Sequence, residues 1–282
     1  LDPLDYARVK KDKSLNAQLF RMQEFTTWYL FFKTEQAPFN DRRVRQAIAH
    51  AIDREALCAT VLSDLAVPAY SMLPPGFPGY SGGNLKEHQV YNPELARQLL
   101  TEAGFPSGRG FPKTDLWLRV ADTSINKVAS EALQAMLKET LGIEINILYQ
   151  QRKIYNDNLF QWQIPMGMLV FAYDYPDPSN MLGQLWRSQP KGYARHDWNH
   201  QAFNDLLDKA NIEMETDERY ATYAKAEAIL AEEAAAIFLF HPVITELRKP
   251  NIRGIKQDRD GRFVPLVSIQ TVNFTDLYIS ED

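Results

Sequence analysis

Cysteine is almost absent from this chain of 282 residues: Cys58 stands alone, which excludes an intramolecular disulfide bond. A single cysteine is compatible with both the cytosol and an oxidising compartment, and cysteine usage therefore leaves the location open. Long apolar runs are absent too, since none approaches the roughly 18 residues that a membrane-spanning helix needs. The first residues, LDPLDYARVKK, lack the basic-then-apolar pattern of a secretory signal. We predict no transmembrane segment in this chain, and we expect any signal peptide to be removed or to lie outside this sequence.

An excess of positive charge is also missing. Lys and Arg number 31 against 36 Asp and Glu, which gives a net charge of −5 and a pI near 5.6. Nucleic-acid binding draws its affinity from clustered cations that displace counterions, so this balance argues against a nucleic-acid partner. Arg42, Arg43 and Arg45 are too isolated to change that, and we expect them on the solvated face of a helix. A hydrophobic content of 45% with 24% charged residues is typical of a globular protein with a sizeable core.

What the chain does contain is a segment with strong helical signals, FNDRRVRQAIAHAIDRE, from Phe39 to Glu55. Asn40 or Asp41 can cap its first turn. Apolar residues then recur at helical spacing, at Val44, Ala47, Ile48, Ala51 and Ile52. These signals predict an amphipathic helix over residues 41–62.

The middle of the chain switches between the two periodicities of regular secondary structure. Apolar residues alternate from Leu116 to Val120, follow helical spacing from Ile125 to Leu137, and alternate again from Ile143 to Ile147. A strand, a helix and a second strand in this order predict a parallel βαβ unit. The fold class that follows is α/β, with helices layered on a sheet.

Caps and turn residues predict further elements. Asn92, Pro93 and Gly104 bracket a helix, and we expect Asp217 to cap another helix over residues 217–235. The apolar run 168–172 predicts a strand that is buried on both faces. The other expected elements are strands over 28–32, 237–240 and 264–269, a helix over 201–212, and a long loop over 71–83. A covering role and a ligand role both remain open for that loop.

The buried strand 168–172 runs into the sequence YDYPDP, where residues that suit a ligand gather. Open α/β sheets bind ligands outside the ends of their strands. The ring of Tyr173 and the carboxylate of Asp174, on a loop stiffened by proline, suit a cation such as an ammonium group. Asp174 and Asp177 can instead cap the turn or the next helix, and we expect that structural role for Asp177.

Histidines offer weaker candidates. His196 and His200 have the spacing of two metal ligands on one helix face, but no third ligand or cysteine accompanies them. We therefore predict a surface pair, no metal site and no cofactor. His241 precedes Pro242 and fits a histidine with its hydrogen bonds satisfied at a strand end. We predict no enzymatic activity, with a hydrolase that uses Asp174 or His241 on an α/β scaffold as the alternative.

Five segments, in order, resemble the family 5 extracellular solute-binding proteins, which are the peptide-, oligopeptide- and nickel-type receptors of ABC importers. They are the segment of residues 39–55 with TTWYLFFKTEQAP before it, YNPELARQLLTEAGFP, SEALQAMLKETLGIEINI, MLVFAYDYPDPSNML and ERYATYAKAEAILAEEAAAIFLFHPV. The resemblance implies a periplasmic binding protein-like fold, in which this chain is a C-terminal portion. Residues 1–35 would end the first lobe and cross over, residues 36–236 would form the second lobe around the βαβ core, and residues 237–282 would supply return strands of the first lobe.

The resemblance also implies a function and a set of ligand contacts. The receptor would capture a peptide or a similar small solute between two lobes for an ABC permease, in the periplasm or outside the cell, free or lipid-anchored. Asp174 matches the aspartate that pairs with the ligand's α-amino group in peptide-binding members. Arg119 lies within one residue of the arginine that binds the ligand's carboxylate in dipeptide-binding relatives, so a carboxylate clamp and a solvated strand end both stay open. Phe171 and Tyr173 stand near the place of a Gly-Trp pair in the family, which changes the pocket wall and leaves peptides, nickel complexes and oligosaccharides open as ligands.

Overall fold

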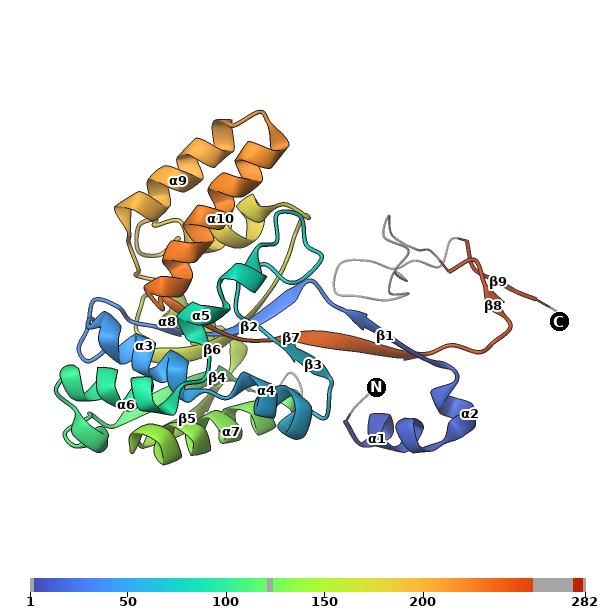
Figure 1. The fold of residues 1–282 in the computed structure, drawn as a ribbon, viewed down its shortest axis with the longest axis horizontal. Coiled ribbons are helices and arrows are strands. Elements are labelled where there is room, and N and C mark those ends of the chain that lie inside the picture. Colours follow the sequence, from blue (N-terminus) through green and yellow to red (C-terminus); the bar gives the residue numbers. More distant parts are fainter. Residues whose placement is uncertain (1–2, 121–123, 256–275, 281–282) are drawn as a thin grey trace.

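The computed structural model describes residues 3–120, 124–255 and 276–280 (Figure 1). The strands are β1 (Leu19–Gln23), β2 (Thr26–Phe32), β3 (Ala66–Pro68), β4 (Thr114–Arg119), β5 (Ile145–Gln150), β6 (Met166–Ala172), β7 (Ala236–Leu247), β8 (Ile252–Arg253) and β9 (Tyr278–Ile279). The α-helices are α1 (Pro3–Lys11), α2 (Lys13–Asn16), α3 (Arg42–Ala51), α4 (Arg54–Ala56), α5 (Lys86–Gln89), α6 (Pro93–Glu102), α7 (Ser124–Leu141), α8 (Arg152–Phe160), α9 (Gln201–Ile212) and α10 (Thr216–Glu232). Short 3₁₀ or π-helical segments are η1 (Leu57–Val61), η2 (Gly82–Asn84), η3 (Pro106–Gly108) and η4 (Ser179–Gln184).

A mixed sheet organises the molecule, with strand order β1-β7-β2-β6-β4-β5 and with β3 paired to β7. Strand β4 is parallel to β5 and to β6, whereas β2 is antiparallel to β6 and to β7. The unit β4–α7–β5 is the predicted parallel βαβ crossover, with Leu116 opposite Ile147 in the sheet. The α/β fold class and its βαβ core are therefore confirmed.

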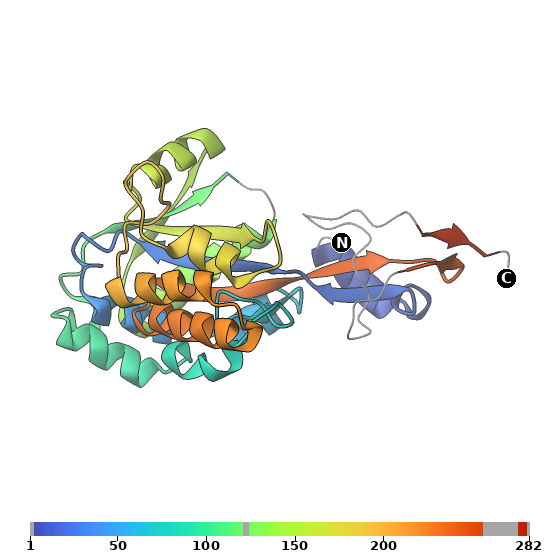
Figure 2. The same cartoon turned by 90° about the horizontal axis from the view of Figure 1, so that it is seen from above.

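Helices cover both faces of this sheet (Figures 1 and 2). Helices α3, α6 and α7 pack on one face, where Ile48 and Leu133 join the core. Helices α8, α9 and α10 pack on the other face, where Phe203 and Leu230 are buried. Strand β6 lies between the two layers, so its successive side chains enter different cores, and the prediction of a strand buried on both faces is confirmed.

The first predicted helix begins as expected but ends early. The Asp41 carboxylate accepts a hydrogen bond from the N–H of Arg43 at 2.9 Å, which confirms Asp41 as the N-cap of α3. The helix stops at Ala51, because Ile52 has an extended backbone and Asp53 caps a new turn by accepting from the N–H of Ala56. The prediction of one continuous helix over 41–62 is therefore wrong at this point.

Arg45 is the exception among the arginines that were expected on a solvated helix face. Its side chain is only 4% exposed, and its guanidinium donates to the carbonyl oxygens of Phe39 and Glu233. The end of α10 covers this side of α3, which the helical pattern alone does not reveal. Arg42 and Arg43 do lie at the surface.

Arg54 is a buried guanidinium that joins three parts of the body. It donates to the carbonyl oxygens of Phe238, Ala49, Ile52 and Gln89, and to the Gln89 side chain, from a position that is 1% exposed. Burial lowers the pKa of Arg54 to about 10, so it remains charged at neutral pH. Its acceptors tie the end of α3 to α5 and β7.

Two strands leave the body together as a ribbon, which is formed by β1 and the outer part of β7 (Figures 1 and 2). Strand β7 pairs with β2 as far as Phe240, and with β1 from Val243 onward. Between these two stretches, the N–H of Glu24 donates to the carbonyl oxygen of Pro242. Proline has no N–H to continue the ladder, so the change of partner occurs at this residue. The divisions expected at residues 35 and 237 fall on the body side of this ribbon, because β2 and the inner part of β7 are strands of the body.

The remaining predictions of helices and strands are either confirmed, wrong or outside the described residues. The helices expected after Asn92 and over 201–212 are confirmed as α6 and α9, and Asn92 accepts a hydrogen bond from the N–H of Leu95. Asp217 does not cap α10, because Glu215 occupies that position and Asp217 lies in the first turn. The strand expected over 264–269 lies outside the described residues. In the described ranges, none of the helices is both long and apolar enough to cross a membrane.

Candidate ligand-binding site

The carboxyl ends of three parallel strands meet at one edge of the body. Strand β4 ends at Arg119, β5 at Gln150 and β6 at Ala172. Thr26, the first residue of β2, stands opposite Ala172, and β2 follows the ribbon directly. We call these strand ends, with the residues that follow them, the strand-end edge. It lies where the body meets the ribbon.

Asp174 lies on the strand-end edge, and its side chain is exposed. The N–H of Asp174 donates to Asn180 Oδ1 at 2.9 Å, and Asn180 Nδ2 donates to Asp174 Oδ2 at 3.1 Å. Asn180 is fully buried, so it offers Asp174 a fixed partner. The carboxylate of Asp174 is thus oriented by the protein and still reachable from solvent, as a preorganised binding group should be.

Asp177 has the structural role that was expected for it. Its carboxylate accepts a hydrogen bond from the N–H of Ser179 at 2.9 Å and two from the guanidinium of Arg219 on α10. Burial acts to raise the pKa of Asp177, but the hydrogen bonds from Arg219 and Ser179 outweigh it, and the pKa lies below its usual value. The ion pair fastens the segment after β6 to α10.

Tyr173 is held in a triangle of aromatic rings. Its ring centroid lies 5.8 Å from that of Phe25 and 5.8 Å from that of Phe77, in edge-to-face contacts. Phe25 belongs to the link between β1 and β2, and Phe77 belongs to the loop over residues 71–83. The loop over residues 71–83 therefore packs against the strand-end edge through Phe77.

The same loop is anchored by a buried carboxylate. Glu227 of α10 accepts a hydrogen bond from the N–H of Leu73 at 2.8 Å, and the Ser81 hydroxyl lies 3.5 Å from its other oxygen. Burial raises the pKa of Glu227 to about 7. Thr27 adds a second anchor, because its hydroxyl donates to the carbonyl oxygen of Met72 at 2.7 Å.

Phe171, which was predicted as a ligand contact, lies near the end of β6. It is only 6% exposed, and the guanidinium of Arg195 lies over its ring, 5.2 Å from the centroid. A ligand that approaches from this side would meet Arg195 before the ring. Arg195 was not among the residues predicted from the sequence.

Arg119 projects from the sheet face that α8, α9 and α10 cover. Its neighbours Leu116 and Leu118 enter the opposite core, and side chains alternate along a strand. Burial raises the pKa of Tyr29, and the positive charges of Arg195 and Arg119 partly offset that rise. Arg195 contacts Phe171, which packs in the core on this face, so both guanidinium groups lie on the same face of the sheet.

The histidines do not form a metal site or a catalytic pair. His196 and His200 do not share a helix: His196 is 6% exposed and stacks on Trp186, and His200 caps α9, so the predicted surface pair is wrong. His241 is 1% exposed in β7, where its Nδ1 donates to the carbonyl oxygen of Thr26 at 3.2 Å, which confirms a satisfied strand histidine. The described residues hold no cluster of three or more His, Cys, Asp or Glu that could bind a metal ion.

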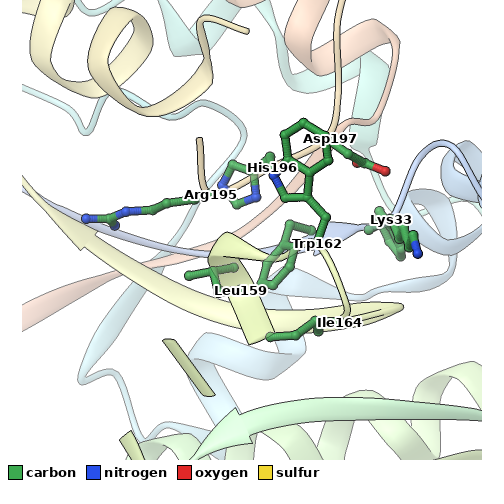
Figure 3. A pocket seen from close by; sticks show the side chains of 9 residues that line it. Lys33, Leu159, Trp162, Ile164, Arg195, His196 and Asp197 are labelled. Atoms are coloured by element: carbon green, nitrogen blue, oxygen red, sulfur yellow. The ribbon is translucent and has the colours of Figure 1, made fainter. Parts of the chain in front are cut away.

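Two hollows lie at the other end of β6, away from Asp174. The larger has a volume of about 310 Å³ and is lined by Glu35, Trp162, Ser188, Gln189, Pro190, His196, Asp197, Trp198 and Asn199. The smaller, of about 10 Å³, is shown in Figure 3, where the side chain of Arg195 points away from Lys33 and Trp162. We take the strand-end edge as the candidate site because the exposed carboxylate of Asp174, the ring of Tyr173 and the guanidinium of Arg119 are groups that can bind a charged solute.

Sequence reasoning missed the residues that support Asp174 and Tyr173. Asn180 lies within the quoted segment MLVFAYDYPDPSNML, so its amide was the available signal for a partner of Asp174. Arg195, Phe25 and Phe77 come from distant segments, and their positions depend on tertiary packing that no local pattern encodes.

Known proteins of similar sequence include peptide-binding proteins, and also proteins named for binding haem or deoxycholate. The chain is 27% identical to the dipeptide-binding protein of Escherichia coli over 268 residues, which cover 93% of this chain and 48% of that protein. It is 29% identical to the periplasmic oligopeptide-binding protein OppA of Salmonella typhimurium over 236 residues, which cover 81% of this chain and 42% of that protein. The chain thus spans about half the length of these curated relatives.

A solved structure agrees with these relatives. The murein tripeptide binding protein MppA of Escherichia coli matches with a TM-score of 0.73 at 26% identity, covering 89% of this chain and 48% of that one. This similarity confirms the periplasmic binding protein-like fold. The sequence profile of the family described as "Bacterial extracellular solute-binding proteins, family 5 Middle" matches residues 1–193. The chain therefore belongs to the family 5 bacterial extracellular solute-binding proteins.

Proposed function

We propose that this chain supplies one lobe and the hinge of a solute receptor that delivers a peptide or a similar small solute to an ABC permease. The family assignment and the peptide-binding relatives support this function. They also support a location in the periplasm or outside the cell. A receptor of this kind works by closing two lobes around its ligand, so that binding shifts an equilibrium between open and closed forms.

The body between the two crossings of the ribbon would be the second lobe. The ribbon of β1 and outer β7 would carry the chain to the first lobe, because both of its strands leave the large sheet at the same point. The boundaries then lie near Glu24 and Pro242. Residues outside them would belong to the first lobe or to the crossover.

One observation carries the proposal most directly: Asp174 lies beside the ribbon, exposed and oriented by the buried Asn180. A carboxylate in this position can meet the α-amino group of a peptide as the lobes close. Arg119, on the neighbouring strand end, would then face the peptide's carboxylate. Tyr173 would form the wall between them.

Calorimetry on the receptor in the full length that its gene encodes tests the role of Asp174. A set of di- to tetrapeptides is compared with the same peptides acetylated at the amino terminus, which removes the ammonium charge. We expect Asp174→Asn to weaken binding of the free-amine peptides by about 2–5 kcal/mol, as when one partner of a buried charge pair is lost. The acetylated peptides should respond much less.

Asp208→Asn is a matched control, because Asp208 forms an exposed ion pair with Arg187 on the surface. It should leave the affinity unchanged. If Asp174→Asn also leaves it unchanged, Asp174 is not part of the site.

The alternative of a hydrolase receives no support. His241 is buried in β7 with its Nδ1 hydrogen engaged by Thr26, and so it cannot serve as an accessible base. The family consists of binding proteins. Binding without turnover is therefore the activity that we propose.

A further inference from the structure

The side chain of Arg195 reaches toward the strand-end edge, where it contacts Phe171. Its guanidinium lies over the ring of Phe171, 5.2 Å from the centroid, and the side chain is partly buried. Within the described ranges it takes part in no ion pair with Asp or Glu. The partly buried Arg219, by contrast, pairs with Asp177.

Stacking on a ring prepares a guanidinium for an anion. The contact with Phe171 fixes the plane of the group, while its N–H edge remains available to bind a carboxylate with two hydrogen bonds. Phe171 lies on β6, Tyr173 directly follows the end of β6 at Ala172, and both side chains pack against the core on the face that α8, α9 and α10 cover. Arg195 is therefore close to the wall of the proposed site.

Two guanidinium groups therefore lie on the same face of the sheet. Arg119 comes from the end of β4, and Arg195 comes from the connection that precedes α9. Arg119 projects from this face, and Arg195 contacts Phe171, which packs in the core on the same face. A neutral peptide has one carboxylate, at its carboxyl terminus, and one arginine is sufficient to bind it.

We propose that Arg195 binds a second anionic group of the ligand, so that the receptor selects peptides that carry an acidic side chain. This inference rests on the proposed function, because it takes Asp174 as the partner of the amine and Arg119 as the partner of the terminal carboxylate. The acidic side chain would lie against Arg195, away from the negative charge of Asp174. Complementary charges of this kind discriminate between ligands of the same size.

Calorimetry on the full-length receptor tests this selectivity with isosteric peptide pairs. The probes are tripeptides of alanine with Glu at the first, second or third position, and the same peptides with Gln. For at least one position, we expect the Glu peptide to bind about tenfold or more tightly than its Gln counterpart, since a charged pair is worth at least that factor when partly buried. Arg195→Gln should remove this difference and leave the affinity for the Gln peptide nearly unchanged.

Two further variants test whether Arg195 has only a structural role. Arg195→Lys keeps the charge but loses the planar fork, so it should retain part of the preference for Glu. Arg187→Gln, a change in the same connection before α9, should alter neither affinity. Equal loss for the Glu and Gln peptides in Arg195→Gln would mean that Arg195 only supports the fold, and the inference would be wrong.

The outcomes also separate this inference from the proposed function. If the receptor binds the tripeptides but treats Glu and Gln alike at every position, the proposed function stands and the role of Arg195 is rejected. If it binds none of the peptides, the proposed function is rejected and this inference with it.

Discussion

The carboxylate of Asp177 accepts hydrogen bonds from both terminal nitrogens of Arg219, at 2.5 and 2.8 Å, and joins the segment after β6 to α10. Asp174 lies three residues before Asp177. The ion pair therefore fixes the segment that carries Asp174, the proposed partner of the ligand's amino group.

Loss of this ion pair should lower stability. We expect Asp177→Asn to reduce the free energy of unfolding by about 1–3 kcal/mol, because both partners are partly buried and the bonds are charge-assisted. Denaturant unfolding measures the change. A double-mutant cycle with Arg219→Met should show coupling between the two sites, and additive effects would mean that the pair contributes nothing as a pair.

Arg54 should be among the most sensitive positions in the body. Replacing it with Met leaves the carbonyl oxygens of Phe238 and Gln89 buried without their donor, and we expect a loss of about 3–5 kcal/mol in stability. Arg54→Lys should also destabilise the protein, since one ammonium group cannot reach all of these acceptors. Arg187→Met, on the surface, should shift the unfolding midpoint far less. Similar midpoints for the Arg54 and Arg187 variants would contradict the assigned role.

The titration of Glu227 should make the free energy of unfolding depend on pH between about 4.5 and 7, the pKa values of this group in the unfolded and folded states. Its pKa is raised from 4.5 to about 7 in the folded protein, so the folded state binds the extra proton and its contribution to stability is complete at acid pH. That contribution is lost as the pH rises through about 7, at a cost on the order of 3 kcal/mol.

Urea unfolding at several pH values between 5 and 8 tests this sign. Glu227→Gln resembles the protonated form and can still accept from the N–H of Leu73. The difference in stability between variant and wild type should grow in favour of the variant as the pH rises. A constant difference across this range would show that Glu227 does not titrate there.

Two glycines that follow helices provide a matched pair of substitutions. Gly104 follows α6 and Gly142 follows α7, and both have a positive φ, of 96° and 70°. A Cβ on Gly142 would lie 2.5 Å from the carbonyl oxygen of Ser107, whereas a Cβ on Gly104 would meet nothing within 4 Å.

Alanine should therefore cost more stability at Gly142 than at Gly104. We expect about 1–2 kcal/mol at Gly104, from backbone strain alone. The loss at Gly142 should be larger by about 1 kcal/mol or more, because the contact is with backbone that must move. Thermal unfolding of the two variants measures the difference, and equal losses would show that the contact relaxes without cost.

The sequence was sufficient for the layered architecture because local periodicity and tertiary structure agree there. The alternation at Leu116 and Ile145 and the helical spacing between them dictate strand, helix and strand, whatever surrounds them. The end of α6 and the cap at Asp41 were predictable for the same reason. Each is decided by residues within one turn of the chain.

The rest depended on contacts between distant segments. Arg45 looks solvated on a helical projection, and it is buried because the end of α10 reaches it. His196 looks like half of a surface pair, and it is buried because Trp186 and Tyr29 pack around it. For the candidate site, Asp174 could be nominated from the sequence, whereas Arg195 and Phe77 could not, because only the fold brings them to β6.

Strand β7 is continuous across the point where the body meets the ribbon, whereas its partner is interrupted between β1 and β2. A continuous strand of this kind acts as a lever. From Pro242 to Leu247 it extends about 16 Å, so a bend of about 10° at Pro242 would displace its far end by about 3 Å. Small torsional changes at one proline would thus be amplified into a movement large enough to open or shut an interface. Such a hinge would be effective because the outer part of β7 is stiff and moves as one unit.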